Sequence, residues 1–246
     1  MELISGYLKT QDGIFISTNH YLNGHKKAVI IAHGFYNSKN SLLLQKLKDS
    51  LIKKYDVFLF DFRGHGESGG VFTLTSKESL DLQVVIEHLK ERYKKIGVVG
   101  FSLGGSIAIN TMALDPKTVK SLVCVSSPSD VSKVDYKIFE PDAEKDIFYA
   151  LFLKDGKIGK GVKPGPFWLA KTRPVDSAPK LKASVLYITG DKDWLVKPWH
   201  SQALYDSTKS RKKLLIVKTG SHAEYMLQGY FKILLSAIEN WFSKTL

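Results

Sequence analysis

The sequence has a single cysteine, no long hydrophobic run and no block of basic residues, although its formal net charge is +12. One cysteine excludes an intramolecular disulfide, and Cys124 lies in the apolar run SLVCVS, which predicts a packing residue rather than a nucleophile or metal ligand. No apolar run approaches the roughly 20 residues that a membrane-spanning helix needs. The N-terminus lacks the basic and apolar regions of a secretory signal. These absences predict a cytoplasmic protein without stable membrane insertion.

The positive charge is spread along the chain rather than concentrated. Lysines occur in ones and twos, and acids follow them at helical spacing in SLIKKYD and EHLKERYKK. This pattern indicates a solvated lysine-rich surface and argues against nucleic acid as a partner. No HExxH, CxxC or paired-aspartate spacing is present, so we expect neither a metal nor a cofactor. The expected assembly is a monomer or a homodimer.

Eight apolar or alternating segments predict strands. They cover 3–8, 14–19, 28–32, 57–61, 96–100, 120–126, 184–190 and 213–217. Helical spacing predicts helices near 41–54, 103–114, 199–208 and 227–244, and TSKE at 75–78 predicts a capping box at the start of another. Unbroken apolar strands that alternate with helices are typical of a mostly parallel sheet with helices on both faces. The predicted fold class is therefore α/β.

The alternation is interrupted between residues 129 and 176. This stretch combines an aromatic-rich segment, DIFYALFL, with the Gly/Lys/Pro loop KDGKIGKGVKPGPFW. We interpret it as a short cap insertion over the strand ends, which divides a single core into 1–128 and 177–246. No internal repeat or low-complexity tract is present.

The motif GFSLGG at 100–105 follows an apolar strand and precedes a helical segment. A lone G-x-S-x-G pattern is weak evidence, but between a strand and a helix it predicts a sharp turn that holds the serine above the sheet. Gly100 and Gly104 then provide room for the neighbouring backbone. The helix N-terminus supplies backbone donors beneath the serine. Ser102 is the predicted nucleophile.

A serine hydroxyl needs a base, and the base needs a carboxylate to orient it. His222, just past the last predicted strand, is the predicted base. Asp193 is the first choice for the carboxylate, with Asp191 second and Asp130 third. Two backbone N–H groups should stabilise the oxyanion, and their positions predict Phe35 and Leu103 as the donors.

The motifs HGF, DFRGHGES, GFSLGG, GDKDWLV and GSHAEYM occur in an order and spacing that resemble those of the α/β-hydrolases. The resemblance is to the group of monoacylglycerol lipases, cinnamoyl or feruloyl esterases and serine aminopeptidase-like proteins (hydrolase 4). It covers the chain outside the insertion. It implies the same roles for Ser102, Asp193 and His222, and it implies that DFRGHGES is a structural turn.

Aromatic and apolar residues near these motifs are candidates for substrate binding. They are Phe35, Tyr36, Trp194, Leu195, Tyr225, Met226, Phe148, Tyr149, Phe152, Phe167 and Trp168. As a set they suggest an apolar pocket for an acyl or aryl group. The expected function is hydrolysis of a small carboxylic ester through an acyl-enzyme. Alternatives are an amide, peptide or thioester hydrolase, where the acids between 140 and 146 would bind a substrate's amino terminus, and a non-catalytic ligand-binding homologue.

Overall fold

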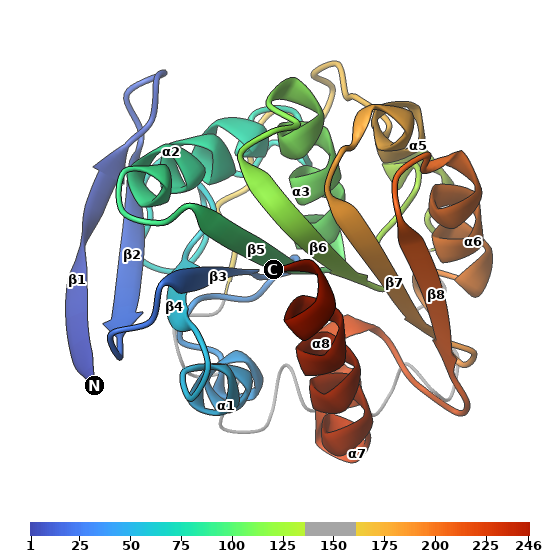
Figure 1. Cartoon of the computed structure of the whole chain (residues 1–246). Helices are drawn as coiled ribbons and strands as arrows, with labels where there is room; N and C mark the ends of the chain where they lie inside the picture. Colours follow the sequence, from blue (N-terminus) through green and yellow to red (C-terminus); the bar gives the residue numbers. More distant parts are fainter. Residues whose placement is uncertain (136–160) are drawn as a thin grey trace.

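A single twisted sheet runs through the middle of the molecule (Figure 1). The computed structural model describes residues 1–135 and 161–246. The strands are β1 (Glu2–Lys9), β2 (Phe15–Leu22), β3 (Lys27–Ala32), β4 (Asp56–Phe60), β5 (Lys95–Phe101), β6 (Val119–Val125), β7 (Ser184–Gly190) and β8 (Lys212–Val217). The eight predicted strands are all present.

The sheet has the strand order β1-β2-β4-β3-β5-β6-β7-β8. The first hairpin is antiparallel and β2 pairs antiparallel with β4, whereas the strands from β4 to β8 pair in parallel. The carboxyl ends of the parallel strands therefore lie along one edge, where ligands of open α/β sheets bind. The predicted fold class is confirmed.

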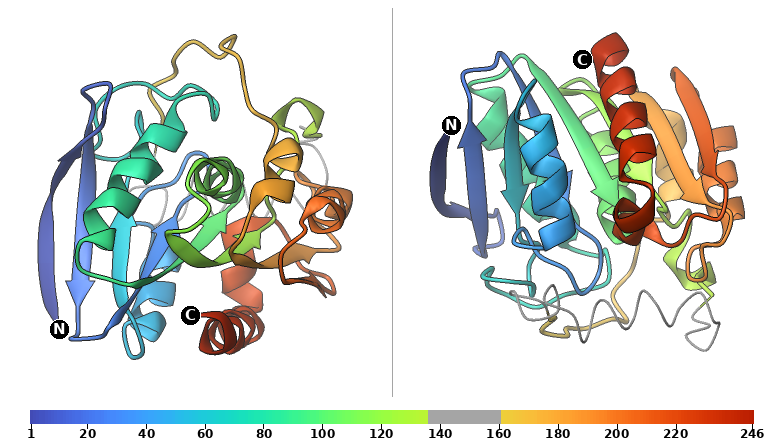
Figure 2. Two further views of the ribbon diagram at one scale, coloured as in Figure 1. Left: turned by 45° about the horizontal axis from the view of Figure 1, so that its top comes forward. Right: turned by 90° about the horizontal axis from the view of Figure 1, so that it is seen from below.

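Helices cover both faces of the sheet. They are α1 (Leu42–Leu51), α2 (Glu78–Lys90), α3 (Leu103–Leu114), α5 (Pro174–Ser177), α6 (Pro198–Ser207), α7 (Met226–Gly229) and α8 (Phe231–Thr245). Figure 2 shows α1 and α8 on one face, with α2, α3 and α6 on the other. Each face has its own hydrophobic cluster, one including Leu82, Ile107 and Leu204 and the other Leu47 and Ile238.

The predicted capping box at 75–78 is wrong. Helix α2 begins at Glu78, and its N-cap Lys77 makes no side-chain capping bond. Thr73 takes the place expected for Thr75, because its hydroxyl accepts a hydrogen bond from the Lys77 amide at 3.0 Å. The positive φ of Thr75, 74°, carries the backbone away from capping geometry. Much of the predicted cap insertion, residues 136–160, lies outside the described residues.

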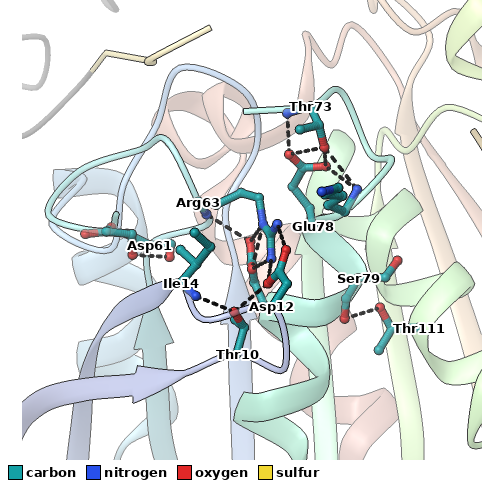
Figure 3. Close-up of polar contacts among 12 residues, drawn as sticks. Thr10, Asp12, Ile14, Asp61, Arg63, Thr73, Glu78, Ser79 and Thr111 are labelled. Carbon is teal, nitrogen blue, oxygen red and sulfur yellow. Dashed lines mark hydrogen bonds and ion pairs between the residues drawn. The ribbon is translucent and has the colours of Figure 1, made fainter. Parts of the chain in front are cut away.

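A buried arginine joins the first hairpin to the turn after β4 and to α2 (Figure 3). The Arg63 Nη1 and Nη2 atoms donate to the carboxylate of Asp12 at 2.8 and 3.0 Å. Its Nε and Nη2 atoms also donate to Oδ1 of Asp81 at 2.9 and 2.7 Å. Asp81 is fully buried and Arg63 is nearly so. This network fixes DFRGHGES as a structural turn, in agreement with the sequence prediction.

The Asp12 carboxylate predicts an acid-dependent loss of stability. The hydrogen bonds from Arg63 lower the pKa of Asp12 from 3.8 to about 2. A lowered native pKa contributes stability above the unfolded-state pKa and loses it as the pH falls through the native value. In urea denaturation, D12N should therefore be less stable than wild type at pH 7, and the difference should shrink as the pH falls from about 4 toward 2. A difference independent of pH would contradict this contribution.

Candidate active site

The nucleophile candidate lies in a strained turn between β5 and α3. Ser102 has φ 50° and ψ −120°, and it is 6% exposed. A Cβ at Gly100 would lie 2.5 Å from the Cα atom of Gly105, and one at Gly104 would lie 2.4 Å from the carbonyl oxygens of Ala32 and His33. Only glycine fits at either position, because the neighbouring backbone occupies the space. The flanking glycines thus permit the turn that holds Ser102 above the end of the sheet.

Three side chains from different strand ends form a hydrogen-bonded chain. Ser102 Oγ lies 3.1 Å from Nε2 of His222. The Nδ1 atom of His222 lies 2.9 and 3.0 Å from the carboxylate oxygens of Asp193. His222 is 4% and Asp193 1% exposed, so water contributes little screening. The geometry allows Nδ1–H to donate to Asp193 while Nε2 accepts the serine proton.

The Asp193 carboxylate is itself held by backbone donors. Its Oδ1 atom accepts hydrogen bonds from the amides of Leu195 at 3.1 Å and Val196 at 2.8 Å. The second-choice acid, Asp191, is exposed, whereas the Nδ1 atom of His222 contacts Asp193. The third, Asp130, accepts from the Ser132 amide and hydroxyl instead. The structure thus brings the first-choice acid to His222.

The remaining buried histidines have structural surroundings. Nε2 of His33 accepts from the amide of Phe62 at 3.0 Å. Burial lowers the pKa of His65 to about 3 and that of His200 to about 4, so both imidazoles are neutral at physiological pH. Nδ1 of His200 lies 2.9 Å from Ser129 Oγ. The contact with Ser102 Oγ comes from His222.

The loop after β3 lies against Ser102. A Cβ at Gly34 would lie 3.2 Å from the Ser102 Cβ atom, so a side chain there would crowd the nucleophile. The next residue, Phe35, lines the same cavity as Ser102, and so does Leu103, the first residue of α3. The two predicted oxyanion donors thus belong to segments that meet at Ser102.

A buried carboxylate missed by the sequence interpretation ties this loop to the turn after β8. Asn37 Nδ2 donates to Oε1 of Glu224, and Glu224 is 2% exposed. Its other oxygen, Oε2, would lie 3.4 Å from a Cβ at Gly34 and accepts no hydrogen bond within the described part of the chain. The available signal was its position two residues after His222 in GSHAEYM. Glu224 links the loop that bears Phe35 to the turn that bears His222.

An apolar cavity of about 280 Å³ opens beside Ser102. Its lining residues are Phe35, Phe72, Leu74, Ser102, Leu103, Pro128, Val134, Phe167, Leu195 and Val196. Phe35, Leu195 and Phe167 were among the sequence candidates. Phe72 and Leu74 were not, because their segment between β4 and α2 carries no motif that the sequence analysis associated with the site.

The other described candidates do not line this cavity. They are Tyr36, Trp194, Trp168, Tyr225 and Met226. The Trp194 ring packs edge-on against the His222 ring, 6.0 Å between centroids, while Trp168 is 85% exposed. Tyr225 packs against the hydrophobic cluster beneath α8, and Tyr36 lies beside Phe35. Phe148, Tyr149, Phe152 and the acids between 140 and 146 lie outside the described residues.

Metal-ligand clusters and membrane-spanning helices are both absent from residues 1–135 and 161–246. No group of three or more His, Cys, Asp or Glu side chains there has the geometry to hold a metal ion. No described helix is both long and apolar enough to cross a bilayer. Burial raises the pKa of the Cys124 thiol, which fits the packing role expected from the sequence.

A family model matches about half of the chain. The family model for the alpha/beta hydrolase fold matches residues 27–153. A probable alcohol acetyltransferase of Cyberlindnera jadinii is 30% identical over 114 residues, which cover 46% of this chain and 31% of that protein. The chain therefore spans less than a third of that relative's length.

Two solved structures extend the likeness to nearly the whole chain. An esterase of Pyrococcus furiosus superposes with a TM-score of 0.77 at 25% identity, covering 99% of this chain and 93% of the other. Est1E of Butyrivibrio proteoclasticus, with ferulic acid bound, has a TM-score of 0.76 at 20% identity and covers 98% of both chains. The second likeness concerns the fold alone.

Proposed function

The chain belongs to the α/β-hydrolase fold family, and from this premise we propose that it is a serine hydrolase of carboxylic esters. The observation that carries the proposal is the hydrogen-bonded chain of Ser102, His222 and Asp193 at the edge of an apolar cavity. Serine becomes an effective nucleophile when a neighbouring base takes its proton. The similarity to the Pyrococcus furiosus esterase at full length supports the same reading.

Acylation follows from the positions of these atoms. Ser102 Oγ attacks the ester carbonyl carbon, and its proton passes to Nε2 of His222, 3.1 Å away. Asp193 stabilises the imidazolium through Nδ1–H. The backbone N–H groups of Phe35 and Leu103 donate to the oxyanion, a contribution that is typically about a hundredfold or more in rate for each donor. His222 then protonates the leaving alcohol, and Ser102 remains acylated.

Deacylation repeats the same reaction steps, with water as the nucleophile in place of Ser102. His222 takes a proton from a water molecule as the water attacks the acyl carbon. The second tetrahedral intermediate uses the same two backbone donors, and its collapse returns the proton to Ser102. The products are a carboxylic acid and an alcohol.

The cavity favours a small apolar acyl or aryl group. Its lining side chains are hydrophobic apart from Ser102. Its volume of about 280 Å³ lies just below the ~300 to 1,000 Å³ typical of ligand pockets. Burial of each methylene contributes about 0.8 kcal/mol, so turnover should rise with acyl length until the cavity is filled. We therefore expect a maximum at short to medium chains.

The test is a panel of p-nitrophenyl esters from acetate to palmitate, beside p-nitroanilides and thioesters of the same acyl groups. We expect the esters to be cleaved fastest, with a maximum below the longest chains. A fluorophosphonate probe should modify the peptide that contains Ser102, as read by mass spectrometry. Faster turnover of the anilides or thioesters would contradict the ester assignment and indicate an amide or thioester hydrolase instead. A folded protein with neither turnover nor adduct would support the non-catalytic alternative.

A further inference from the structure

One wall of the cavity is built from a strained segment. Phe72 and Leu74 line the cavity, and the segment continues through Thr75 into α2. Leu74 and Thr75 have φ values of 54° and 74°. Positive φ is uncommon for any residue with a side chain and is disfavoured most for a β-branched one such as threonine. Such a backbone persists only where its surroundings hold it in place.

The surroundings that hold this segment centre on Glu78, the first residue of α2 (Figure 3). Its Oε1 atom accepts from the Thr73 amide at 2.6 Å. The Thr73 hydroxyl lies 3.0 Å from both carboxylate oxygens and accepts in turn from the Lys77 amide at 3.0 Å. Thr73 stands between the two cavity-lining residues of the segment. Its contacts with Glu78 therefore set the position of both.

Glu78 differs from an ordinary helix-capping residue because its carboxylate is buried. Glu78 has no exposed surface and forms no ion pair with the described part of the chain. A buried carboxylate without a counter-charge is costly unless hydrogen bonds satisfy its oxygens. Here the donors come from the strained segment and from Lys77 at its end. The carboxylate and the segment are thus each stabilised by the other.

The segment is also joined to the rest of the cavity. The Phe72 amide donates to the carbonyl oxygen of Lys163 at 2.8 Å. The Phe72 ring packs against the rings of Phe35, His65 and Phe167, with centroid distances of 5.4, 4.9 and 6.0 Å. A shift of Thr73 would therefore be passed to Phe72 and from it to two other residues that line the cavity.

We propose that Glu78 is a positioning residue that determines acyl-chain specificity, by holding Phe72 and Leu74 at the depth that defines the cavity. The inference rests on the proposed function. Glu78 itself is not among the residues that line the cavity, and the hydrogen-bond partner of Ser102 Oγ is His222. Its removal should therefore alter the discrimination between acyl chains and leave the chemistry at the ester carbonyl intact.

The test uses two variants and a matched control. E78Q keeps the side chain's shape but loses an acceptor, and T73V removes the hydroxyl that both carboxylate oxygens contact. T111V is the control, because the buried Thr111 hydroxyl also contacts the first turn of α2, at the Ser79 carbonyl oxygen, but not residues 72–75 (Figure 3). For each protein, kcat/KM is measured on p-nitrophenyl acetate, butyrate, hexanoate and octanoate.

Wild type and T111V should gain up to about fourfold in kcat/KM for each methylene the cavity accepts. E78Q and T73V should keep acetate turnover within about twofold of wild type, while the ratio of the best longer ester to acetate falls about tenfold. An unchanged ratio in both folded variants would overturn the inference. So would an equal loss on every ester, acetate included, because that would place the effect at the triad or in general stability.

Wild-type activity separates this inference from the proposed function. If folded wild type cleaves no ester, the proposed function fails. The chain-length preference of the cavity is then measured by ligand binding instead of turnover. Straight-chain carboxylic acids of the same lengths are then tested for the increase they cause in thermal denaturation midpoint. An increase with chain length in wild type and T111V that is lost in T73V supports the role of Glu78. The same length dependence in T73V, or none in wild type, contradicts it.

Discussion

Replacement of Ser102 by alanine should reduce ester turnover by about 10⁶-fold, because the side chain that forms the acyl-enzyme is lost. The backbone should tolerate the change, since alanine is the smaller side chain and the Ser102 amide keeps its hydrogen bond to the Val125 carbonyl oxygen at 2.8 Å. Substrate binding should persist, because the cavity is otherwise unaltered. The measurement is kcat and KM on the best p-nitrophenyl ester, with circular dichroism as a check on folding.

Ser127→Ala is the matched control for this variant. Ser127 lies two residues after the end of β6, whereas Ser102 directly follows β5, and Ser127 is 1% exposed. Its hydroxyl contacts the Cys124 thiol and lies outside the chain of Ser102, His222 and Asp193. S127A should therefore retain nearly full turnover and remain reactive with a fluorophosphonate, whereas S102A should not react. Turnover that survives in S102A, or a loss of equal size in S127A, would contradict the assignment of the nucleophile.

Replacement of Asp193 by asparagine should lower kcat by about 10⁴-fold with little change in folding. The amide side chain has no negative charge to stabilise the imidazolium of His222. It would also place an N–H group where Nδ1–H now meets a carboxylate oxygen, at 2.9 or 3.0 Å. His222 would then favour the tautomer that carries its proton on Nε2 and cannot accept one from Ser102. The measurement is the burst of p-nitrophenol and the steady-state kcat on the same ester.

The two other acids considered from the sequence provide the comparison. Asp191 lies in the same turn as Asp193 but is exposed, and Asp130 is engaged with Ser132. D191N and D130N should both remain close to wild-type turnover. A large loss in D191N with little in D193N would mean that the acid of the working enzyme differs from the one the geometry indicates.

Much of this architecture follows from local features of the sequence. Apolar runs such as AVIIA and VFLFD predicted buried strands, because a strand that is covered on both faces has no solvent-facing side and so needs no alternating polar residues. GFSLGG predicted the strained turn, since close backbone approach at Gly100 and Gly104 leaves no alternative to glycine. His222 and Asp193 were selected because polar residues that follow parallel strands converge at one edge of the sheet.

The sequence therefore determined the fold class and pointed to Ser102 and His222, with Asp193 first among three acids, while the tertiary structure selected the acid and decided what surrounds these residues. Phe72 and Leu74 reach the cavity from a segment that local patterns described only as the approach to a helix. Glu78 is a buried anchor rather than half of a capping box, because its partner is Thr73, brought into reach by positive φ at Leu74 and Thr75. Periodicity records the preferences of neighbouring residues, whereas these contacts depend on how distant segments pack.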